Sequence, residues 1–350
     1  MAEATGEGVH RGAGRPATVV RLDHSAGAAV SIDVGARHLA VAVGDLAHRV
    51  MAEHWTALPI AHRADEGMER ATTLVRQMLE KAGVHEKAVI GVAMGLPAPI
   101  SQPDGLVASS NILPGWAGVQ VGAEMSERLG MPVFIENDSN LGALAESAWG
   151  AGAGYDQLAY IKAATGIGAG LVHDGKLFRG TTGTAGEIGH TTVAEDGPIC
   201  RCGNRGCLEL YAGGAALLGA LRQSHPDVET LEQVVELAHE NHPACARVLA
   251  DAGAHIGVAI ANLINLFNPR RIVVGGELAG AGDTLLQPMR VAAERSAVQT
   301  AIEAVEIVPG VLGQRAEVLG GLALVLFEPW RFGASELLTS AIPEAEAVST

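Results

Sequence analysis

The segment TAGEIGHTTVAEDGPICRCGNRGCLE, residues 184–209, contains a histidine and three of the four cysteines of the chain. Three thiolates and one imidazole are a ligand set that binds Zn²⁺ in a closed tetrahedral site. Gly203 and Gly206 allow the backbone to turn sharply between the ligands. The spacing therefore predicts a structural zinc site, with reduced cytosolic thiols or a chance cluster as the alternatives. The four predicted ligands are His190, Cys200, Cys202 and Cys207.

Two acidic residues bracket this segment. Glu187 lies three residues before His190, and Glu209 lies two residues after Cys207. Carboxylates are weaker zinc ligands than thiolates and imidazole, but they accept hydrogen bonds from hydroxyl groups. We therefore expect Glu187 and Glu209 to contact a hydroxyl-bearing ligand beside the metal.

The pattern His-x9-Cys-x-Cys-Gly-x2-Gly-Cys-x-Glu resembles the hallmark of the ROK family, which contains bacterial sugar kinases and sugar-responsive transcriptional repressors. Each fixed position is matched, and the resemblance extends from about residue 28 to about residue 327. It implies an α/β protein with a duplicated actin-like ATPase (ribonuclease H-like) fold, in which two lobes flank a cleft. It also implies a hexose or amino-sugar ligand and a homo-oligomer.

Composition sets further limits on function. The chain has 350 residues, of which 48% are hydrophobic and only 3% aromatic, so two domains with an aliphatic core are expected. A net charge of −15 argues against DNA binding by this chain unaided. We recognise no membrane-spanning run and no signal peptide. Because thiolate ligands require reducing conditions, we expect a cytoplasmic protein.

The ends of the chain differ from its middle. Residues 1–27 lack periodicity and predict a flexible tail. Within them, Gly12–Leu22 resembles the wing that ends the DNA-binding domain of the family's repressors, although a low-complexity Gly/Arg tail explains the same composition. The helix-turn-helix expected before such a wing is missing, so DNA contact is expected only through a missing N-terminal domain. Residues 333–350 predict a disordered tail.

Between these ends, a strand–turn–strand pattern over residues 32–43 recurs over residues 160–172, which indicates a weak internal duplication. We expect an N-terminal lobe over 28–140, completed by the C-terminal helix 316–329. A C-terminal lobe over 141–315 then carries the zinc loop 187–209. The expected helices cover residues 64–82, 118–129, 141–149, 208–223, 229–240, 243–267, 283–296 and 316–329.

The sequence Glu136-Asn137-Asp138 joins an expected strand to the helix that follows. Spacing alone favours Asn137 and Asp138 as helix caps, although functional residues also occur where strands end. The resemblance favours the second interpretation and implies that Asp138 takes the proton of a sugar hydroxyl during phosphoryl transfer. The sugar contacts that it implies are Asn111, Asn137, Asp138, Glu187, His190 and Glu209.

Two glycine-rich segments match the family's nucleotide-binding regions, and a third departs from the pattern. The expected turn Thr165–Gly170 matches the second phosphate loop, and Gly275-Gly276 matches the adenosine region. Family kinases carry Asp-x-Gly-Gly-Thr in the first loop, where this chain has Asp33-Val-Gly-Ala36-Arg37. The Cβ of Ala36 intrudes where backbone should approach phosphate, and Arg37 cannot replace a small hydroxyl. The expected nucleotide contacts are Thr165, Gly166, Gly168, Gly275 and Gly276.

Three functions remain open at this point. The wing-like segment and the altered first loop favour the sugar-sensing region of a transcriptional regulator. Asp138 and the intact second loop favour an ATP-dependent sugar kinase of glucokinase type, with ATP and Mg²⁺ as cofactors. A catalytically silent sugar-binding remnant is the third possibility. All three predict a sugar beside a structural Zn²⁺ ion, and none identifies the sugar.

Overall fold

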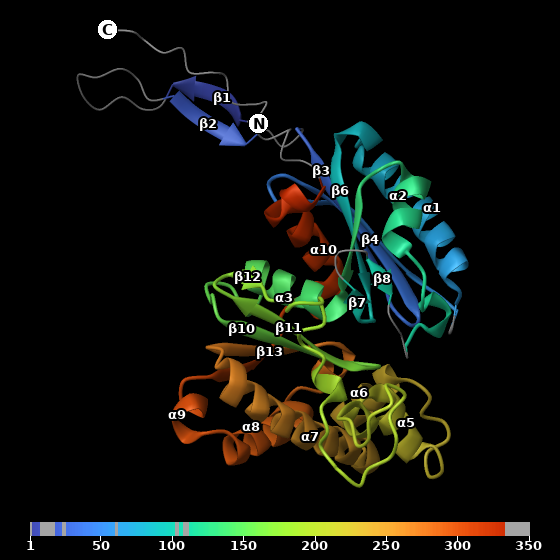
Figure 1. Cartoon of the computed structure of the whole chain (residues 1–350), viewed down its shortest axis with the longest axis vertical. Coiled ribbons are helices and arrows are strands. Elements are labelled where there is room, and N and C mark those ends of the chain that lie inside the picture. Colours follow the sequence, from blue (N-terminus) through green and yellow to red (C-terminus); the bar gives the residue numbers. More distant parts are fainter. Residues whose placement is uncertain are drawn as a thin grey trace, which may run out of the picture.

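The computed structural model describes residues 2–7, 18–22, 26–59, 62–101, 105–107 and 112–332, with residues 2–7 and 18–22 described by their backbone alone. Two five-stranded sheets dominate it (Figure 1). The first has the order β5-β4-β3-β6-β9 and the second the order β12-β11-β10-β13-β14. The strands of the first sheet are β3 (Ala28–Val34), β4 (His38–Asp45), β5 (Val50–Ala57), β6 (Val89–Leu96) and β9 (Val133–Asn137). Those of the second are β10 (Leu158–Ala163), β11 (Ile167–His173), β12 (Lys176–Leu177), β13 (Arg271–Gly275) and β14 (Glu306–Pro309).

The two sheets have the same topology. In each sheet, the first three strands in sequence form an antiparallel meander. The fourth strand pairs in parallel with the first, and the fifth pairs in parallel with the fourth. The matching hairpins are β3–β4 and β10–β11, the two segments in which the sequence pattern recurs. The parallel strands are rich in buried aliphatic residues, as expected where helices cover both faces of a sheet. The predicted duplication is therefore present in the fold.

Two helices form the layer between the sheets (Figure 1). Helix α3 (Asp138–Trp149) packs on β10 and β11, and α10 (Ala316–Phe327) packs on β3, β6 and β4. Their shared core joins small residues of the first sheet, such as Ala42 and Ala93, to Tyr160 and Val273 of the second. The C-terminal helix thus contributes to the N-terminal half of the fold, because its apolar side chains cover that sheet's inner face.

The remaining helices cover the outer faces. Helices α1 (Ala64–Ala82) and α2 (Val121–Leu129) lie on the first sheet, and α7 and α8 pack closely against each other beyond the second (Figure 1). A Cβ at Gly253 of α7 would lie 2.2 Å from the Leu285 carbonyl oxygen of α8, so only glycine permits this approach. The helices beyond the second sheet are α4 (Glu209–Ala212), α5 (Gly214–Leu221), α6 (Leu231–His239), α7 (Pro243–Phe267), α8 (Asp283–Ser296) and α9 (Gln299–Ile302).

Two expected elements differ in the structure, and glycine is the reason in both. The turn expected over Thr165–Gly170 ends early, because β11 begins at Ile167 and pairs in register with β10. Glycine serves close packing there: a Cβ at Gly168 would lie 2.4 Å from Ser139 Oγ. The helix expected over 208–223 is interrupted at Gly213, whose backbone is extended.

A short antiparallel pair lies near the N-terminus. Strand β1 (Ala2–Glu7) pairs with β2 (Thr18–Leu22), and the pair projects away from the two lobes (Figure 1). Part of the segment expected to be a flexible tail is thus regular backbone. The wing interpretation concerns Gly12–Leu22, of which only the last five residues are described, so it stays a prediction. The predicted tail 333–350 lies outside the described residues. A second short pair joins β7 (Ile100–Ser101) to β8 (Leu106–Val107).

Of the helices among the described residues, only α7 is long and apolar enough to cross a membrane. Half of its most apolar window is buried inside the fold, where Leu249, Ile256 and Ile260 contribute to the core. A core helix of a globular lobe has the same length and composition.

Candidate functional site

The predicted metal ligands are brought together by the loop that follows β12. His190 ends a single turn of 3-10 helix, Ile188–His190, and Cys207 lies just before α4. Two isolated bridges, Thr192 to Cys207 and Ile199 to Arg205, fold the loop back on itself. Gly203 and Gly206 have φ angles of 93° and 65°, as their predicted role in sharp turns requires. A Cβ at Gly206 would lie 1.7 Å from the Ala194 carbonyl oxygen, so glycine is required there.

The ligand atoms fit a metal ion. All four lie within 4.8 Å of one another. The Cys200 sulfur is 3.7 Å from His190 Nδ1, and the sulfurs of Cys202 and Cys207 are 3.6 Å apart. Ligands at about 2.3 Å from a tetrahedral Zn²⁺ ion are separated by about 3.8 Å, so these separations suit such an ion. Burial and the neighbouring sulfurs raise the pKa of the Cys207 thiol to about 12, so a bound cation has to drive its deprotonation.

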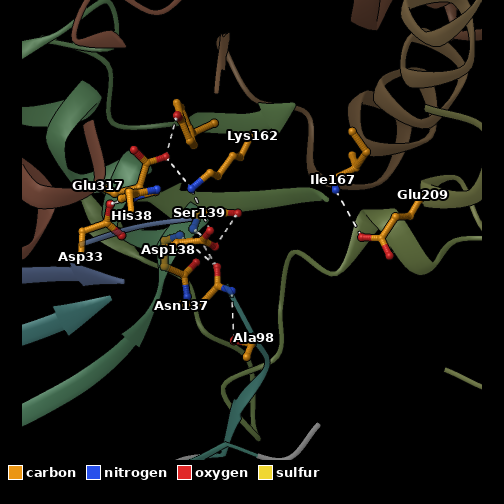
Figure 2. Close-up of polar contacts among 12 residues, drawn as sticks. Asp33, His38, Ala98, Asn137, Asp138, Ser139, Lys162, Ile167, Glu209 and Glu317 are labelled. Carbon is orange, nitrogen blue, oxygen red and sulfur yellow. Dashed lines mark hydrogen bonds and ion pairs between the residues drawn. The ribbon is translucent and has the colours of Figure 1, made fainter. Parts of the chain in front are cut away.

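The same loop positions two carboxylates. Glu187 lies at the start of the 3-10 turn that ends at His190, and Glu209 begins α4 immediately after Cys207. Glu209 Oε2 accepts a long hydrogen bond, 3.4 Å, from the backbone N–H of Ile167 in β11 (Figure 2). The helix break at Gly213 also holds the β10–β11 turn in place, because the Gly214 N–H donates hydrogen bonds to the carbonyl oxygens of Ala164 and Thr165.

Glu187, Glu209 and Asp138 influence one another electrostatically. Burial, followed by the charges of Asp138 and Glu209, raises the pKa of Glu187 to about 7. Such a group exchanges its proton near neutrality, so it can either donate or accept a hydrogen bond. Glu187 and Glu209 thus adjoin the metal cluster along the chain, and Glu187 responds to the charges of both Asp138 and Glu209.

The raised pKa of Glu187 gives a testable pH dependence. The folded protein retains a proton on Glu187 that the unfolded chain loses near pH 4.5, so this group makes folding less favourable as pH rises from about 4.5 to about 7. Replacing Glu187 with Gln is expected to remove that loss, which is at most about 3 kcal/mol. Urea denaturation at pH 5 and pH 8 measures it, with the exposed Glu195→Gln as control. Parallel pH dependence in Glu187→Gln and wild type would contradict the assignment.

Asp138 lies where β9 meets α3, in a polar cluster with Ser139, Lys162 and Glu317 (Figure 2). Its Oδ1 accepts a 2.7 Å hydrogen bond from the Ser139 N–H, and its Oδ2 lies 2.8 Å from Lys162 Nζ. The same Nζ lies 2.9 Å from Glu317 Oε1 of α10. Burial acts to lower the pKa of Lys162, but the charges of Asp138, Glu317 and Asp33 outweigh it and hold that pKa well above its usual value. The lysine is therefore charged.

Asp33 and His38 form a second pair in the first hairpin. His38 Nε2 lies 2.8 Å from Asp33 Oδ2, and its ring stacks on the half-exposed Trp55 at 6.0 Å. Burial opposes ionisation of both groups, yet their mutual attraction lowers the pKa of Asp33 and raises that of His38. The His38 ring also lies over the turn, since a Cβ at Gly35 would meet its atoms at 2.1 Å.

Asn137 has the local role that spacing alone favoured. Its Oδ1 accepts from the Ser139 and Asn140 N–H groups at 2.9 Å and 3.3 Å, which caps α3. Its Nδ2 donates to the Ala98 carbonyl oxygen at 3.1 Å (Figure 2). A role for Asn137 in sugar binding stays a prediction that involves its second amide hydrogen. Asn111 lies outside the described residues.

The predicted nucleotide contacts lie at the ends of the second sheet's strands. Thr165 and Gly166 form the β10–β11 turn, and Gly168 lies inside β11. Gly275 ends β13. Gly276 has a φ of 82°, and a Cβ added to it would lie 2.5 Å from the Ala163 carbonyl oxygen. Close packing within the protein accounts for Gly168 and Gly276, so their roles in phosphate binding stay predictions.

Sequence reasoning did not identify Lys162, His38 or Glu317 as site residues. Lys162 gave one usable signal, because it is a lone charge in a strand whose other residues are all apolar. His38 and Glu317 gave none, because each lies at the start of an expected strand or helix, where polar residues are common. Only the packing of α10 between the sheets brings Glu317 to Lys162.

Comparisons with known proteins agree with this architecture. The ROK family model matches residues 29–328. A xylose repressor from Caldicellulosiruptor bescii is 28% identical over 93% of this chain and 85% of its own length. A glucokinase from Halalkalibacterium halodurans is 33% identical over 85% of this chain and 94% of its own length.

A solved structure shows the same fold. The ROK family glucokinase from Streptomyces griseus, in complex with glucose and AMPPNP, superposes with a TM-score of 0.76 at 28% identity, covering 85% of this chain and 99% of the glucokinase. The predicted actin-like fold is thereby confirmed. This chain belongs to the ROK family.

Proposed function

We propose that this chain is the sugar-sensing region of a carbohydrate-responsive transcriptional regulator. The sugar, a hexose, pentose or amino sugar, binds between Asp138 and the metal loop. Glu187 and Glu209 accept hydrogen bonds from its hydroxyl groups, and His190 donates from Nε2 while Nδ1 holds the metal. The metal is Zn²⁺ with a structural role, because four protein ligands leave no open position for chemistry.

The first hairpin turn is the observation that carries the choice of regulator over kinase. Phosphate binding requires backbone N–H groups that a nucleotide can approach closely. Here Ala36 and Arg37 replace the small residues of the family's kinases, and the His38 ring lies over Gly35. The xylose repressor also matches a larger share of this chain than the glucokinase does, 93% against 85%.

An ATP-dependent sugar kinase is the second candidate. Asp138 at the end of β9 and the higher identity to a glucokinase, 33%, favour it. In that function Asp138 accepts the proton of the attacking sugar hydroxyl, and Mg²⁺-bound ATP supplies the phosphoryl group.

One experiment separates these functions. Calorimetric titration with glucose, xylose, mannose and N-acetylglucosamine is expected to identify a binding sugar. That sugar, incubated with Mg²⁺ and ATP, should give sugar phosphate at far below the roughly 1–100 s⁻¹ typical of kinases. Turnover at kinase rates that Asp138→Asn abolishes would overturn the regulator proposal and establish the kinase.

The sugar-binding residues are tested by matched variants in one loop. Glu187→Gln and Glu209→Gln are each expected to weaken sugar binding by about 10- to 100-fold, because a hydrogen bond to a charged group is lost. The exposed Glu195 lies in the same loop, and Glu195→Gln should leave affinity unchanged. Equal affinities for all three variants would place the sugar elsewhere.

The cellular setting follows from the same proposal. The regulator works in the cytoplasm, where its thiolate ligands stay reduced. Its net charge of −15 assigns DNA contact to another part of the regulator or to a partner, and we propose that it acts as a homo-oligomer, as two-fold operator recognition requires.

A further inference from the structure

A nucleotide-bound Mg²⁺ ion needs carboxylates that can accept a divalent cation. The buried carboxylates of this site already face basic side chains of the chain itself. Lys162 Nζ lies 2.8 Å from Asp138 Oδ2 and 2.9 Å from Glu317 Oε1, and His38 Nε2 lies 2.8 Å from Asp33 Oδ2. The Lys162 side chain is 16% exposed and its two partners 9% and 6%, so these pairs are shielded from water.

Both oxygens of Asp138 are engaged. Oδ2 is bound by the Lys162 ammonium group, and Oδ1 accepts from the Ser139 backbone and, at 3.3 Å, from its hydroxyl (Figure 2). A sugar hydroxyl that hydrogen-bonds to Asp138 therefore adds to existing partners. A proton moving from that hydroxyl to Asp138 would have to approach the adjacent ammonium charge.

Among the described residues, Lys162 is the only cation paired with Asp138 and Glu317. Asp33, Asp138 and Glu317 are all buried, and Tyr160 contributes only a neutral hydroxyl, 3.4 Å from Glu317 Oε1. Burial, opposed in part by Lys162, raises the pKa of Glu317. The negative charges of Asp33 and Asp138 act on Glu317 in this poorly hydrated site, so the arrangement requires a cation.

We propose that Lys162 is an internal cation in the place of a nucleotide-bound metal ion, so that this site binds sugar without a nucleotide and without phosphoryl transfer. The residues present thus do not fit Mg²⁺-bound ATP. This inference rests on the proposed sugar-binding function only in its statement about sugar, because the claim about metal and nucleotide concerns Lys162 alone.

The first test uses the wild-type protein and AMPPNP. Calorimetric titration with Mg²⁺-bound AMPPNP is expected to give no binding at sub-millimolar concentration. The affinity for the sugar should change by less than about twofold when the nucleotide is added, because the two share no metal. Sub-millimolar AMPPNP binding, or a change in sugar affinity above about tenfold, would overturn the inference.

The second test removes the ammonium group. Lys162→Met keeps a side chain of similar length and leaves Asp138 and Glu317 without their ion-pair partner. Protein preloaded with Zn²⁺ is titrated with Mn²⁺ while the signal of the free ion is followed by electron paramagnetic resonance. We expect Lys162→Met to bind Mn²⁺ at least about tenfold more tightly than wild type, and its melting temperature to rise with Mn²⁺ concentration.

The exposed Lys176 of β12 provides the matched control, and Lys176→Met should bind Mn²⁺ as wild type does. If Lys162→Met does not fold, the double variant Lys162→Met/Glu317→Gln removes one negative charge together with the positive one. It is expected to fold and still to bind Mn²⁺ more tightly than wild type, through Asp33 and Asp138. A folded variant without this gain would show that Lys162 is only a structural ion-pair partner. The Mn²⁺ titrations use no sugar, so a failure of sugar binding leaves their outcomes intact.

Discussion

Replacing Cys202 with alanine is expected to release the metal ion and to weaken sugar binding about 100-fold or more. Structural Zn²⁺ contributes about 10–16 kcal/mol of apparent binding free energy in small zinc-dependent folds, and most of it is lost with one ligand. Without the ion, nothing of comparable strength keeps the loop over residues 187–209 closed. Glu187 and Glu209 would then be ordered only at a cost in conformational entropy when a sugar binds.

Cys202 is the most informative ligand to replace because it is the exposed member of the cluster, whereas Cys200 and Cys207 are buried. Its removal leaves no cavity in the core, so a loss of affinity reports on the metal. Cys245→Ala is the control: Cys245 is buried in α7, and its loss should reduce stability while metal content stays the same.

Metal analysis of the purified proteins, followed by calorimetry with the sugar, measures both effects. Wild type and Cys245→Ala are expected to contain about one Zn²⁺ ion per chain, and Cys202→Ala far less. Wild-type protein without metal would remove the zinc assignment. Unchanged sugar affinity in metal-free Cys202→Ala would show that the loop does not organise the sugar site.

Replacing Gly320 with alanine is expected to lower the free energy of unfolding by about 1–3 kcal/mol or more, through overpacking between the sheets. The added Cβ would lie 1.9 Å from the Leu141 carbonyl oxygen of α3, a backbone atom that cannot rotate away. Helices α3 and α10 would have to separate, and both carry residues of the site, Asp138 and Glu317.

Gly219 provides the opposite case, at an exposed position of α5. A Cβ there meets nothing within 4 Å, so Gly219→Ala should raise the free energy of unfolding by about 0.5–1 kcal/mol through helix propensity. Urea denaturation followed by circular dichroism compares the two variants. Equal stabilities would contradict the close α3–α10 contact.

The sequence predicted the features that depend on short segments. The metal ligands were recognisable because all four lie within 18 consecutive residues, His190 to Cys207, where loop geometry alone brings them together. Helix α7 was predicted with its observed ends, since Pro243 starts it and Asn268-Pro269 stops it. The two hairpins indicated the internal duplication, because each repeats the same alternation of apolar residues, and the family resemblance implied the two-lobe fold.

Glycine was the commonest source of error. The same residue marks a turn, a helix break or a close approach of two elements, and the sequence does not distinguish them. Gly168 was assigned to a turn but lies in a strand packed on Ser139, and Gly213 was assigned to a helix that it interrupts. In each case the deciding neighbour lies far away in the sequence.

The sequence by itself determined the family, the metal cluster and the two flanking glutamates, because these depend on local spacing. Only the tertiary structure decided which cation faces Asp138. Lys162 and Glu317 are 155 positions apart and meet because α10 returns to lie between the two sheets. The energy and the role of a buried charge depend on its neighbours in space, since desolvation and Coulomb attraction act through space rather than along the chain.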